Sequence, residues 1–422
     1  MSPHTTSILL FAIQPTFYDV IHDVETGAVP KDQFWVSITR VSGATKYAAV
    51  DVYRIKGAIE LRGLDGIEVL DYSEKFIRLS CSELGVESIE FRRPDVEIKT
   101  NSKISSFDIS PSSNLYAVGS PNGSIALSTF SVSNLNSADK LTRALVGHLS
   151  YVSCVKFFPS GQVLLSCGGD MQIKLWNIGD GKCARTFVGH KRAVVGLAMV
   201  GRGRNFLSAS SDGTVKMWEC GSGEIVHSFT HPTARAAPTN VAVAQRQDGV
   251  VRADCGLLEF ETGDKMAAVG YDNGDVVLFG LATKDVLAVA SAPAEVGDAD
   301  AAVVAVETGA ERHNTWQMVV ARVRSIEIWD MCATTAPLQR VRLASEVVGI
   351  SLDLEVGVVG VATRAGACAV VDSESGCVQW VAASTSASGE EATAAIIVRG
   401  KQIQIAGRSG TLSCFSISDS SG

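Results

Sequence analysis

The sequence predicts a mainly β fold: a seven-bladed β-propeller preceded by a small α+β domain. Three observations lead to this prediction. A unit with a period of 42 residues is written twice, and fainter copies of its strand and turn pattern continue towards the C-terminus. The first 90 or so residues lack the pattern. A period in the low forties is typical of propeller blades.

The repeated unit is clearest over residues 147–219, where four side chains recur at constant spacing. They are His148, Ser166, Asp170 and Trp176 in the first copy and His190, Ser208, Asp212 and Trp218 in the second. This is the signature of a WD repeat. In such a blade the four groups meet at one edge, where the imidazole, hydroxyl, carboxylate and indole N–H satisfy one another. We therefore expect two structural tetrads.

Serine, histidine and aspartate also form the catalytic triad of hydrolases, which is the alternative interpretation. A catalyst needs one triad at one cleft, whereas this set appears twice at identical spacing. Both copies also carry a tryptophan that a triad does not need. The pattern favours a structural role, and we expect no catalytic residues and no enzyme activity.

Net charge, apolar runs and cysteine spacing limit the kinds of partner and compartment that the sequence allows. The net charge is −8, which disfavours nucleic acid and anionic membranes, because both attract basic surfaces. No run of 18 apolar residues is present, and the N-terminal segment lacks the pattern of a signal peptide. Ten cysteines occur without a CxxC pair or a Cys–His cluster, which indicates small core residues in a reducing compartment. We expect a monomer without metal or cofactor.

The elements of the N-terminal domain, residues 1–92, follow from local composition. Residues 7–13, 34–41 and 47–61 are rich in β-branched and aromatic residues and are expected to be strands. Residues 15–27 are expected to form a short helix.

The propeller is expected to cover residues 93–422. Blade one keeps only its Asn-Gly turn at 122–123, a strong hairpin signal. After the two complete blades the pattern decays to single markers, which are Asn273-Gly274 and Phe279 in blade four, Trp329 and Asp330 in blade five, Asp372 in blade six and Phe415 in blade seven. Only three strands remain for blade seven, so we expect residues 95–100 to supply the fourth and close the ring.

Three strings narrow the family. KFFPSG at 156–161, GDMQIKLW at 169–176 and GRGRNFLSASSDGTVKMWECGSG at 201–223 resemble the proteasomal ATPase-associated factor family. An N-terminal domain containing IQPTFYDV and DQFWVSI is also similar to that family. The resemblance implies a non-catalytic chaperone that binds the C-terminal domain of a proteasomal ATPase subunit during assembly of the regulatory particle, in cytoplasm and nucleus. Other assembly factors are further possible partners.

Other functions remain open, because propellers host many activities. The main alternative is a general WD-repeat scaffold or a ubiquitin-ligase substrate receptor, which would use the same face of the ring.

Candidate binding residues lie on the top face, which we define as the face carrying the inter-blade loops and the turns between second and third strands. Tyr151 is an aromatic side chain expected there, and Ser105 and Ser153 are expected to point to the same face. Acidic residues on loops of the later blades are Asp272, Glu295, Asp298, Asp300, Glu346, Glu390 and Glu391.

These acids would form an arc that attracts a basic partner. The alternative is ordinary solvated charge, partly neutralised by arginines at 322, 324, 364 and 408.

The turn Gly201–Asn205 is basic and rich in glycine, like a phosphate-binding loop. It lacks the GK[ST] of a P-loop and joins two antiparallel strands. We expect a hairpin on the bottom face, with contact to a partner or to the N-terminal domain as the alternative.

Overall fold

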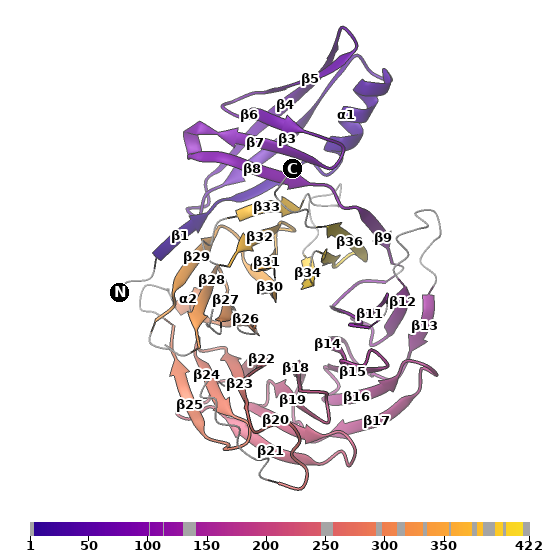
Figure 1. Ribbon diagram of the computed structural model, residues 1–422, viewed down its shortest axis with the longest axis vertical. Coiled ribbons are helices and arrows are strands. Elements are labelled where there is room, and N and C mark those ends of the chain that lie inside the picture. The colour runs from indigo at the N-terminus through magenta and orange to yellow at the C-terminus, as the bar shows by residue number, and fades with distance from the viewer. Residues whose placement is uncertain are drawn as a thin grey trace.

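The computed structural model describes residues 4–100, 102–112, 114–129, 141–245, 256–292, 298–309, 317–331, 336–353, 356–373, 378–382, 393–399 and 402–416. The chain is mainly β, and most of its strands form a ring (Figure 1). Within the described ranges, seven antiparallel four-strand units, which we number ring sheets one to seven, follow one another in chain order.

The ring sheets are built from consecutive strands. The bounds are β10 Ser106–Ile109, β11 Leu115–Gly119, β12 Ile125–Thr129 and β13 Leu141–Leu145 (one); β14 Val152–Phe157, β15 Val163–Gly168, β16 Gln172–Asn177 and β17 Cys183–Val188 (two); β18 Val194–Val200, β19 Asn205–Ser210, β20 Thr214–Glu219 and β21 Ile225–Thr230 (three); β22 Pro238–Gln245, β23 Lys265–Tyr271, β24 Val276–Gly280 and β25 Val286–Ala290 (four).

The later ring sheets continue in the same way. They are β26 Val303–Thr308, β27 Gln317–Arg322, β28 Ser325–Asp330 and β29 Gln339–Leu343 (five); β30 Val347–Asp353, β31 Val358–Thr363, β32 Cys368–Asp372 and β33 Val378–Ala382 (six); β34 Thr393–Arg399, β35 Gln402–Gly407 and β36 Thr411–Ser416, joined by β9 Val96–Lys99 (seven). A short helix, α2 Asp298–Ala301, precedes β26.

The first strand of each ring sheet lines the centre of the ring. Strands β10, β14, β18, β22, β26, β30 and β34 contact one another in that order, and β34 also contacts β10, so the ring is closed. Middle strands are buried on both faces, as in β19 and β27, because neighbouring sheets cover both sides. The outer strand β17 is mostly exposed.

Ring sheet seven is completed by a strand from the other end of the sequence. Strand β9 pairs antiparallel with β36, with Ile98 opposite Leu412. The pairing extends to Asp95, whose N–H donates to the carbonyl of Cys414 at 2.7 Å. This exchange joins residues about 310 positions apart in the sequence.

Residues before the ring form a second packed unit. Its elements are β1 His4–Ile8, β2 Leu10–Ile13, α1 Phe17–Thr26, β3 Lys31–Thr39, β4 Thr45–Ile55, β5 Ala58–Gly63, β6 Glu68–Tyr72, β7 Phe76–Cys81, the 3-10 turn Ser82–Leu84 and β8 Val86–Arg92. Helix α1 buries Phe17 and Val24 against the sheet β2-β3-β4-β5. It ends where Gly27 takes a φ of +80°, which glycine adopts without strain.

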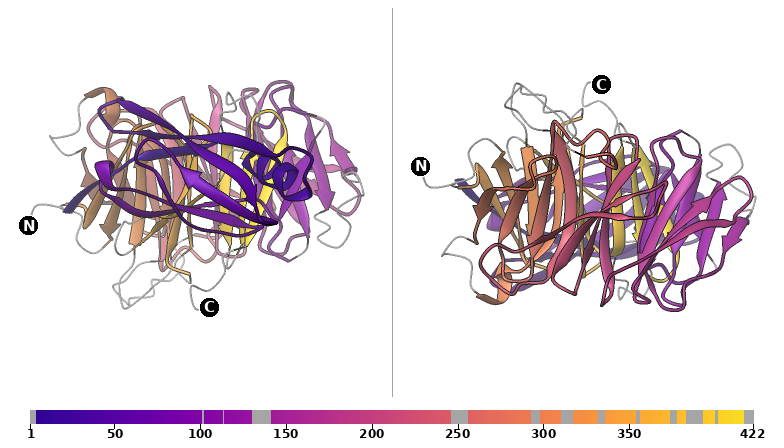
Figure 2. Two further views of the ribbon diagram at one scale, coloured as in Figure 1. Left: turned by 90° about the horizontal axis from the view of Figure 1, so that it is seen from above. Right: turned by 90° about the horizontal axis from the view of Figure 1, so that it is seen from below.

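Two parallel strand pairings attach this unit to the ring. Strand β1 pairs with β29 of ring sheet five, and β8 pairs with β33 of ring sheet six. Val381 of β33 belongs to the same apolar cluster as Phe91 of β8 and Phe34 of β3. The unit therefore lies on the outer rim of the ring, far from ring sheets two and three (Figures 1 and 2).

Candidate protein-interaction site

The four side chains of each repeat are joined by hydrogen bonds. In ring sheet two, Trp176 Nε1 donates to Ser166 Oγ at 2.8 Å, and Ser166 Oγ lies 2.7 Å from His148 Nε2. His148 Nδ1 lies 2.8 Å from Asp170 Oδ2. The chain runs from indole N–H through hydroxyl and imidazole to carboxylate, and a neutral imidazole satisfies every member.

Ring sheet three repeats this chain almost atom for atom. Trp218 Nε1 donates to Ser208 Oγ at 2.8 Å, and His190 lies 2.7 Å from Ser208 and 2.9 Å from Asp212. Ser166 and Ser208 lie on the second strands of their sheets and are fully buried, so neither hydroxyl is accessible to a substrate in solvent.

Electrostatics agree with a neutral histidine beside an ionised aspartate. Burial lowers the pKa of His148 and of His190, although the aspartate partner raises it in each case. Burial also raises the pKa of Asp212, but hydrogen bonds from Thr214, from the Lys191 N–H and from His190 outweigh it and hold that pKa at about 2.

The tetrads also fix the loops of the top face. The second Asp170 contact is the backbone N–H of Leu149, at 3.1 Å, which ties the loop between ring sheets one and two to the β15–β16 turn. Tyr151 lies against the same turn: a Cβ on Gly169 would be 2.5 Å from Tyr151 Cε1. Glycine at 169 therefore makes room for the aromatic ring.

Three apolar side chains are exposed at this place, and we call them the top-face apolar patch. They are Leu149, 87% exposed, Tyr151, 43% exposed, and Met171, 43% exposed. Only Tyr151 was expected from the sequence. Leu149 and Met171 flank residues of the tetrad, and that position is the signal that would have found them.

Of the predicted acids, the structure describes Asp272, Asp300 and Glu346 with their side chains. Asp272 is exposed, and its Oδ1 accepts the N–H of Ala237 at 2.9 Å. Glu346 Oε2 lies 2.8 Å from Arg364 Nη1, and Asp300 Oδ1 lies 3.9 Å from Arg324 Nε. Arginines thus lie beside two acids of the proposed arc. Glu295, Glu390 and Glu391 lie outside the described residues, and for Asp298 only the position in α2 is described.

One expectation about the top face is wrong. Arg322, expected to neutralise loop charge, is fully buried and donates to the carbonyls of Gly274 and Ala301, both at 2.7 Å. Ser105 and Ser153 are half-buried and line the central cavity: Ser105 Oγ donates to Val152 O at 2.6 Å, and Ser153 Oγ donates to Val194 O. Each serine bonds to the next ring sheet, so the two stabilise the contact between neighbouring sheets.

The Gly201–Asn205 turn contacts another part of the ring. The backbone N–H and the Nε of Arg202 both donate to Glu261 at 2.7 Å, and the Asn205 amide donates to Leu258 O at 2.9 Å. Arg204 stacks on Phe260. These residues belong to the segment between β22 and β23, so the turn holds that segment and not the N-terminal unit.

Ring sheets four and five replace the tetrad with different chemistry. In ring sheet four, His231 lies 3.0 Å from Asp275, a pair that the sequence pattern did not predict. In ring sheet five, the Glu327 carboxylate lies between two arginines, 3.0 Å from Arg322 Nε and 3.1 Å from Arg340 Nε. All three side chains are fully buried. Trp329 donates its indole N–H to the same carboxylate at 3.2 Å. We call this set the ring-five ion cluster.

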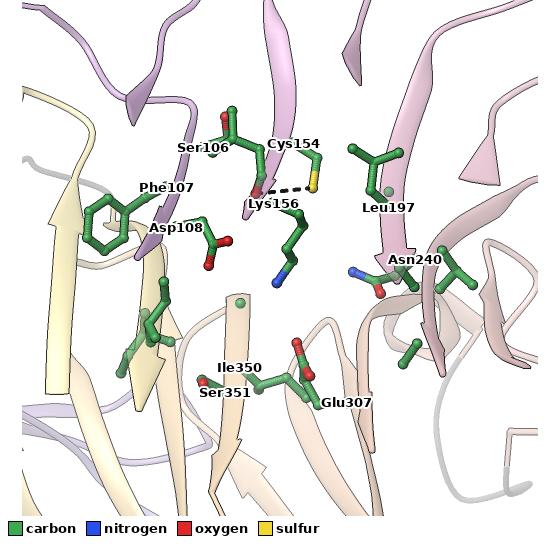
Figure 3. Close-up of a pocket in the computed structure, with 18 of the residues that line it drawn as sticks. Ser106, Phe107, Asp108, Cys154, Lys156, Leu197, Asn240, Glu307, Ile350 and Ser351 are labelled. Carbon is green, nitrogen blue, oxygen red and sulfur yellow. Dashed lines mark hydrogen bonds between the residues drawn. The ribbon is translucent and has the colours of Figure 1, made fainter. Parts of the chain in front are cut away.

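The centre of the ring holds a cavity of about 470 Å³ lined by the first strands. Lys156 extends into it near Asp108 and Glu307 (Figure 3). Burial raises the pKa of both carboxyl groups, and Asp108 raises the pKa of Lys156. These opposite charges compensate one another within the ring. No cluster of metal-ligating side chains occurs among the residues that the structure describes.

Comparisons with known proteins agree with the repeat geometry. Residues 139–177 and 181–219 match the model of the WD domain, G-beta repeat. Two WD repeats are present. Each spans the outer strand of one ring sheet and three strands of the next, β13 to β16 and β17 to β20. Among the described residues, no helix is long and apolar enough to cross a membrane.

A short segment also matches a curated protein. Over 49 residues the chain is 43% identical to the 26S proteasome regulatory subunit RPN14 of Saccharomyces cerevisiae. The match covers 12% of this chain and 11% of the yeast protein. WD repeats indicate a protein-interaction scaffold, and the link to the proteasome rests on this segment.

Proposed function

We propose that this chain is a non-catalytic assembly chaperone that holds the C-terminal domain of an ATPase subunit of the proteasome regulatory-particle base. In this proposal a seven-bladed WD-repeat propeller, residues 93–422, follows an α+β domain, residues 1–92. The protein acts as a monomer in cytoplasm and nucleus. The WD repeats and the segment similar to RPN14 support the proposal.

The observation that carries the proposal is the top-face apolar patch. Its loops are held by the Asp170 carboxylate and by the contact between Tyr151 and the β15–β16 turn, so the backbone that carries the exposed side chains is in place before a partner arrives. Preorganised aromatic and aliphatic side chains make efficient anchors, because little conformational entropy is lost on binding. The N-terminal unit lies at the far rim and leaves this face open (Figure 1).

Charge is the second contribution in this proposal. Reversal of Glu295, Asp298, Asp300, Glu390 and Glu391 to lysine should slow association with a basic partner, and the effect should shrink as salt rises. Asp300 already lies 3.9 Å from Arg324, so its share of the field is reduced. We therefore expect the apolar patch to contribute more binding free energy than the acids.

The test is affinity capture of the tagged full chain from cells. Leu149→Asp combined with Tyr151→Ala should remove proteasome ATPase subunits from the captured material, because both side chains are exposed and their loss leaves the core intact. Val286→Asp is the matched control, since Val286 is 42% exposed on the outer strand β25. It should leave capture unchanged.

Two outcomes would contradict the proposal. Capture of ATPase subunits that survives the double substitution, with a native melting temperature, would place the contact elsewhere. Capture of a cullin-linked ligase in place of ATPase subunits would favour the alternative function as a ubiquitin-ligase substrate receptor. Capture of base subunits without the proteolytic core particle is the result we expect.

A further inference from the structure

Two cysteines face each other across neighbouring strands of ring sheet two. Cys154 on β14 is the direct antiparallel partner of Cys167 on β15. Opposed Cα atoms in antiparallel pairs lie about 4.5 to 5.5 Å apart. This spacing falls within the range of about 4.4 to 6.8 Å that a disulfide spans. Both residues are free thiols in the structure.

The two thiols differ in access to solvent. Cys154 is half-buried and lines the central cavity, where its sulfur lies beside the Val155 carbonyl (Figure 3). Cys167 is buried, and its Sγ lies 3.6 Å from Val194 O and 3.5 Å from Ser153 Oγ. A small solute that enters the cavity of about 470 Å³ therefore reaches Cys154 first.

The two thiols also differ in reactivity. A hydrogen bond from Cys167 lowers the pKa of Cys154, burial opposes it, and the positive charge of Lys156 lowers it further. Burial raises the pKa of Cys167 well above its ordinary value. The thiolate, which is the nucleophile in cysteine chemistry, therefore forms more readily on Cys154 than on Cys167.

We propose that Cys154 and Cys167 form a peroxide-reactive dithiol that closes to an intramolecular disulfide. The Cys154 thiolate attacks one oxygen of a hydroperoxide, the O–O bond breaks, and Cys154 sulfenic acid and hydroxide or alkoxide result. Cys167 then transfers its thiol proton to the hydroxyl of the sulfenic acid as its sulfur bonds to the Cys154 sulfur, and the S–O bond breaks to release water. Two thiols are oxidised by two electrons, and one hydroperoxide is reduced.

The strand pairing holds the two cysteines opposite each other before oxidation. The two strands are already paired around the cysteines, with Val155 opposite Ser166 as the next pair. Cys183 is exposed at the outer edge of the same ring sheet, and Cys81 is buried outside the ring, so the chain supplies an accessible and an inaccessible single thiol for comparison.

The experiment treats the reduced full chain with hydrogen peroxide, alkylates remaining thiols and digests with trypsin without reductant. Trypsin cuts after Arg143, Lys156 and Lys174, so the two cysteines fall on separate peptides, 144–156 and 157–174. Mass spectrometry should detect these peptides linked, with both free-thiol signals lost together and restored by dithiothreitol. The Cys81 thiol should persist.

Two variants, with Cys183→Ser as a control, show which cysteine is oxidised first. Cys167→Ser should accumulate a dimedone adduct on Cys154 that the wild type lacks. Cys154→Ser should leave Cys167 unoxidised, and Cys183→Ser should behave as the wild type. Absence of the linked peptides in the wild type, while Cys183 becomes oxidised, would overturn the proposal. Equal dimedone labelling of Cys154 in wild type and Cys167→Ser would also overturn it, because Cys167 would then not resolve the sulfenic acid.

Discussion

Ring sheets three and five place a tryptophan at the same point of the third strand and satisfy its indole N–H in opposite ways. Trp218 donates to a neutral hydroxyl, which belongs to a hydrogen-bonded chain that ends at the carboxylate of Asp212 in the β19–β20 turn. Trp329 donates to the carboxylate of Glu327, which is buried between two arginines. The same position in the fold therefore accepts a hydrogen-bond network or an ion cluster.

The tetrad and the ring-five ion cluster differ in the charge that they bury. The tetrad carries its charge on Asp212 at one end, so loss of an inner uncharged member such as Ser208 leaves neutral polar groups unpaired but no unpaired charge. The ion cluster carries one negative and two positive charges away from water, and each arginine depends on Glu327 or on carbonyls such as Gly274 O. Desolvated charges are costly when a partner is removed. We expect the two regions to respond differently to substitution.

The largest effect is expected for Glu327→Ala. It leaves Arg322 and Arg340 buried without their carboxylate, and loss of one partner from a buried ion pair costs about 3 to 5 kcal/mol. Urea unfolding measures the change in free energy.

The control for this substitution replaces Arg322, Glu327 and Arg340 together with methionine. Apolar replacement of a whole buried ion cluster is often neutral or stabilising. A triple variant as unstable as Glu327→Ala would show that packing, not charge, governs this region.

Trp218→Ala is expected to rank next to it, at roughly 3 to 5 kcal/mol, because a large buried side chain is lost. Trp218→Phe keeps most of the volume and removes the indole N–H, so it should cost much less. Thermal melting of both variants separates packing from hydrogen bonding. An unchanged melting temperature for Trp218→Ala would contradict the structural role of the tetrad.

Ser208→Ala should have an intermediate effect of about 1 to 3 kcal/mol. It removes the partner of both Trp218 Nε1 and His190 Nε2, which lie in a buried setting. Ser228→Ala is the matched control on the outer strand β21, where Ser228 is exposed, and should change stability by less than about 0.5 kcal/mol. Urea unfolding measures the change in free energy for both variants. An equal loss for Ser208→Ala and Ser228→Ala would contradict the role of Ser208 in the tetrad.

The smallest effect is expected from pH. The pKa of His148 and His190 is lower in the folded chain than the ordinary value of 6.5, so the unfolded chain binds more protons as pH falls. The contribution of the two histidines to the free energy of unfolding is present above about pH 6.5 and declines below it. Asp212, with a folded pKa of about 2 against 3.8, adds a further loss between about pH 4 and 2.

Melting temperatures between pH 8 and 5 check the histidine contribution. The double variant His148→Gln and His190→Gln should lose less on acidification than the wild type does. A wild-type melting temperature that rises from pH 7 to pH 5 would contradict the sign of the argument.

Much of this architecture could be anticipated from the sequence, because the tetrad requires four residue types at fixed spacing. That requirement makes the positions of Ser166 and Asp170 interpretable from the order of residues alone. Short polar turns such as Asn273-Gly274 also mark strand ends where the tetrad has gone. The helix expected over 15–27 corresponds to α1, Phe17–Thr26.

The features that the sequence did not predict have a common physical cause. Arg322 and Glu327 form a partnership across two strands, and a buried ion pair has no fixed spacing in sequence. Leu149 and Met171 became candidates only when their exposure was known, since most exposed apolar residues are unremarkable. Strands β6 to β8 were also missed, although they carry the sheet from the N-terminal unit into the ring.

The strand exchange at ring sheet seven bears on how the protein is made. Residues 96–99 leave the ribosome long before their partner β36 at 411–416, and β1 and β8 likewise await β29 and β33. At translation rates of about 5 to 20 residues per second, the interval for β9 is roughly 15 to 60 seconds. Throughout that interval the nascent chain exposes strand edges that other chains can capture. These edges are covered one after another as β29, β33 and β36 emerge, and truncation before β29 would leave β1 and β9 without their pairing strands and one edge of β8 uncovered.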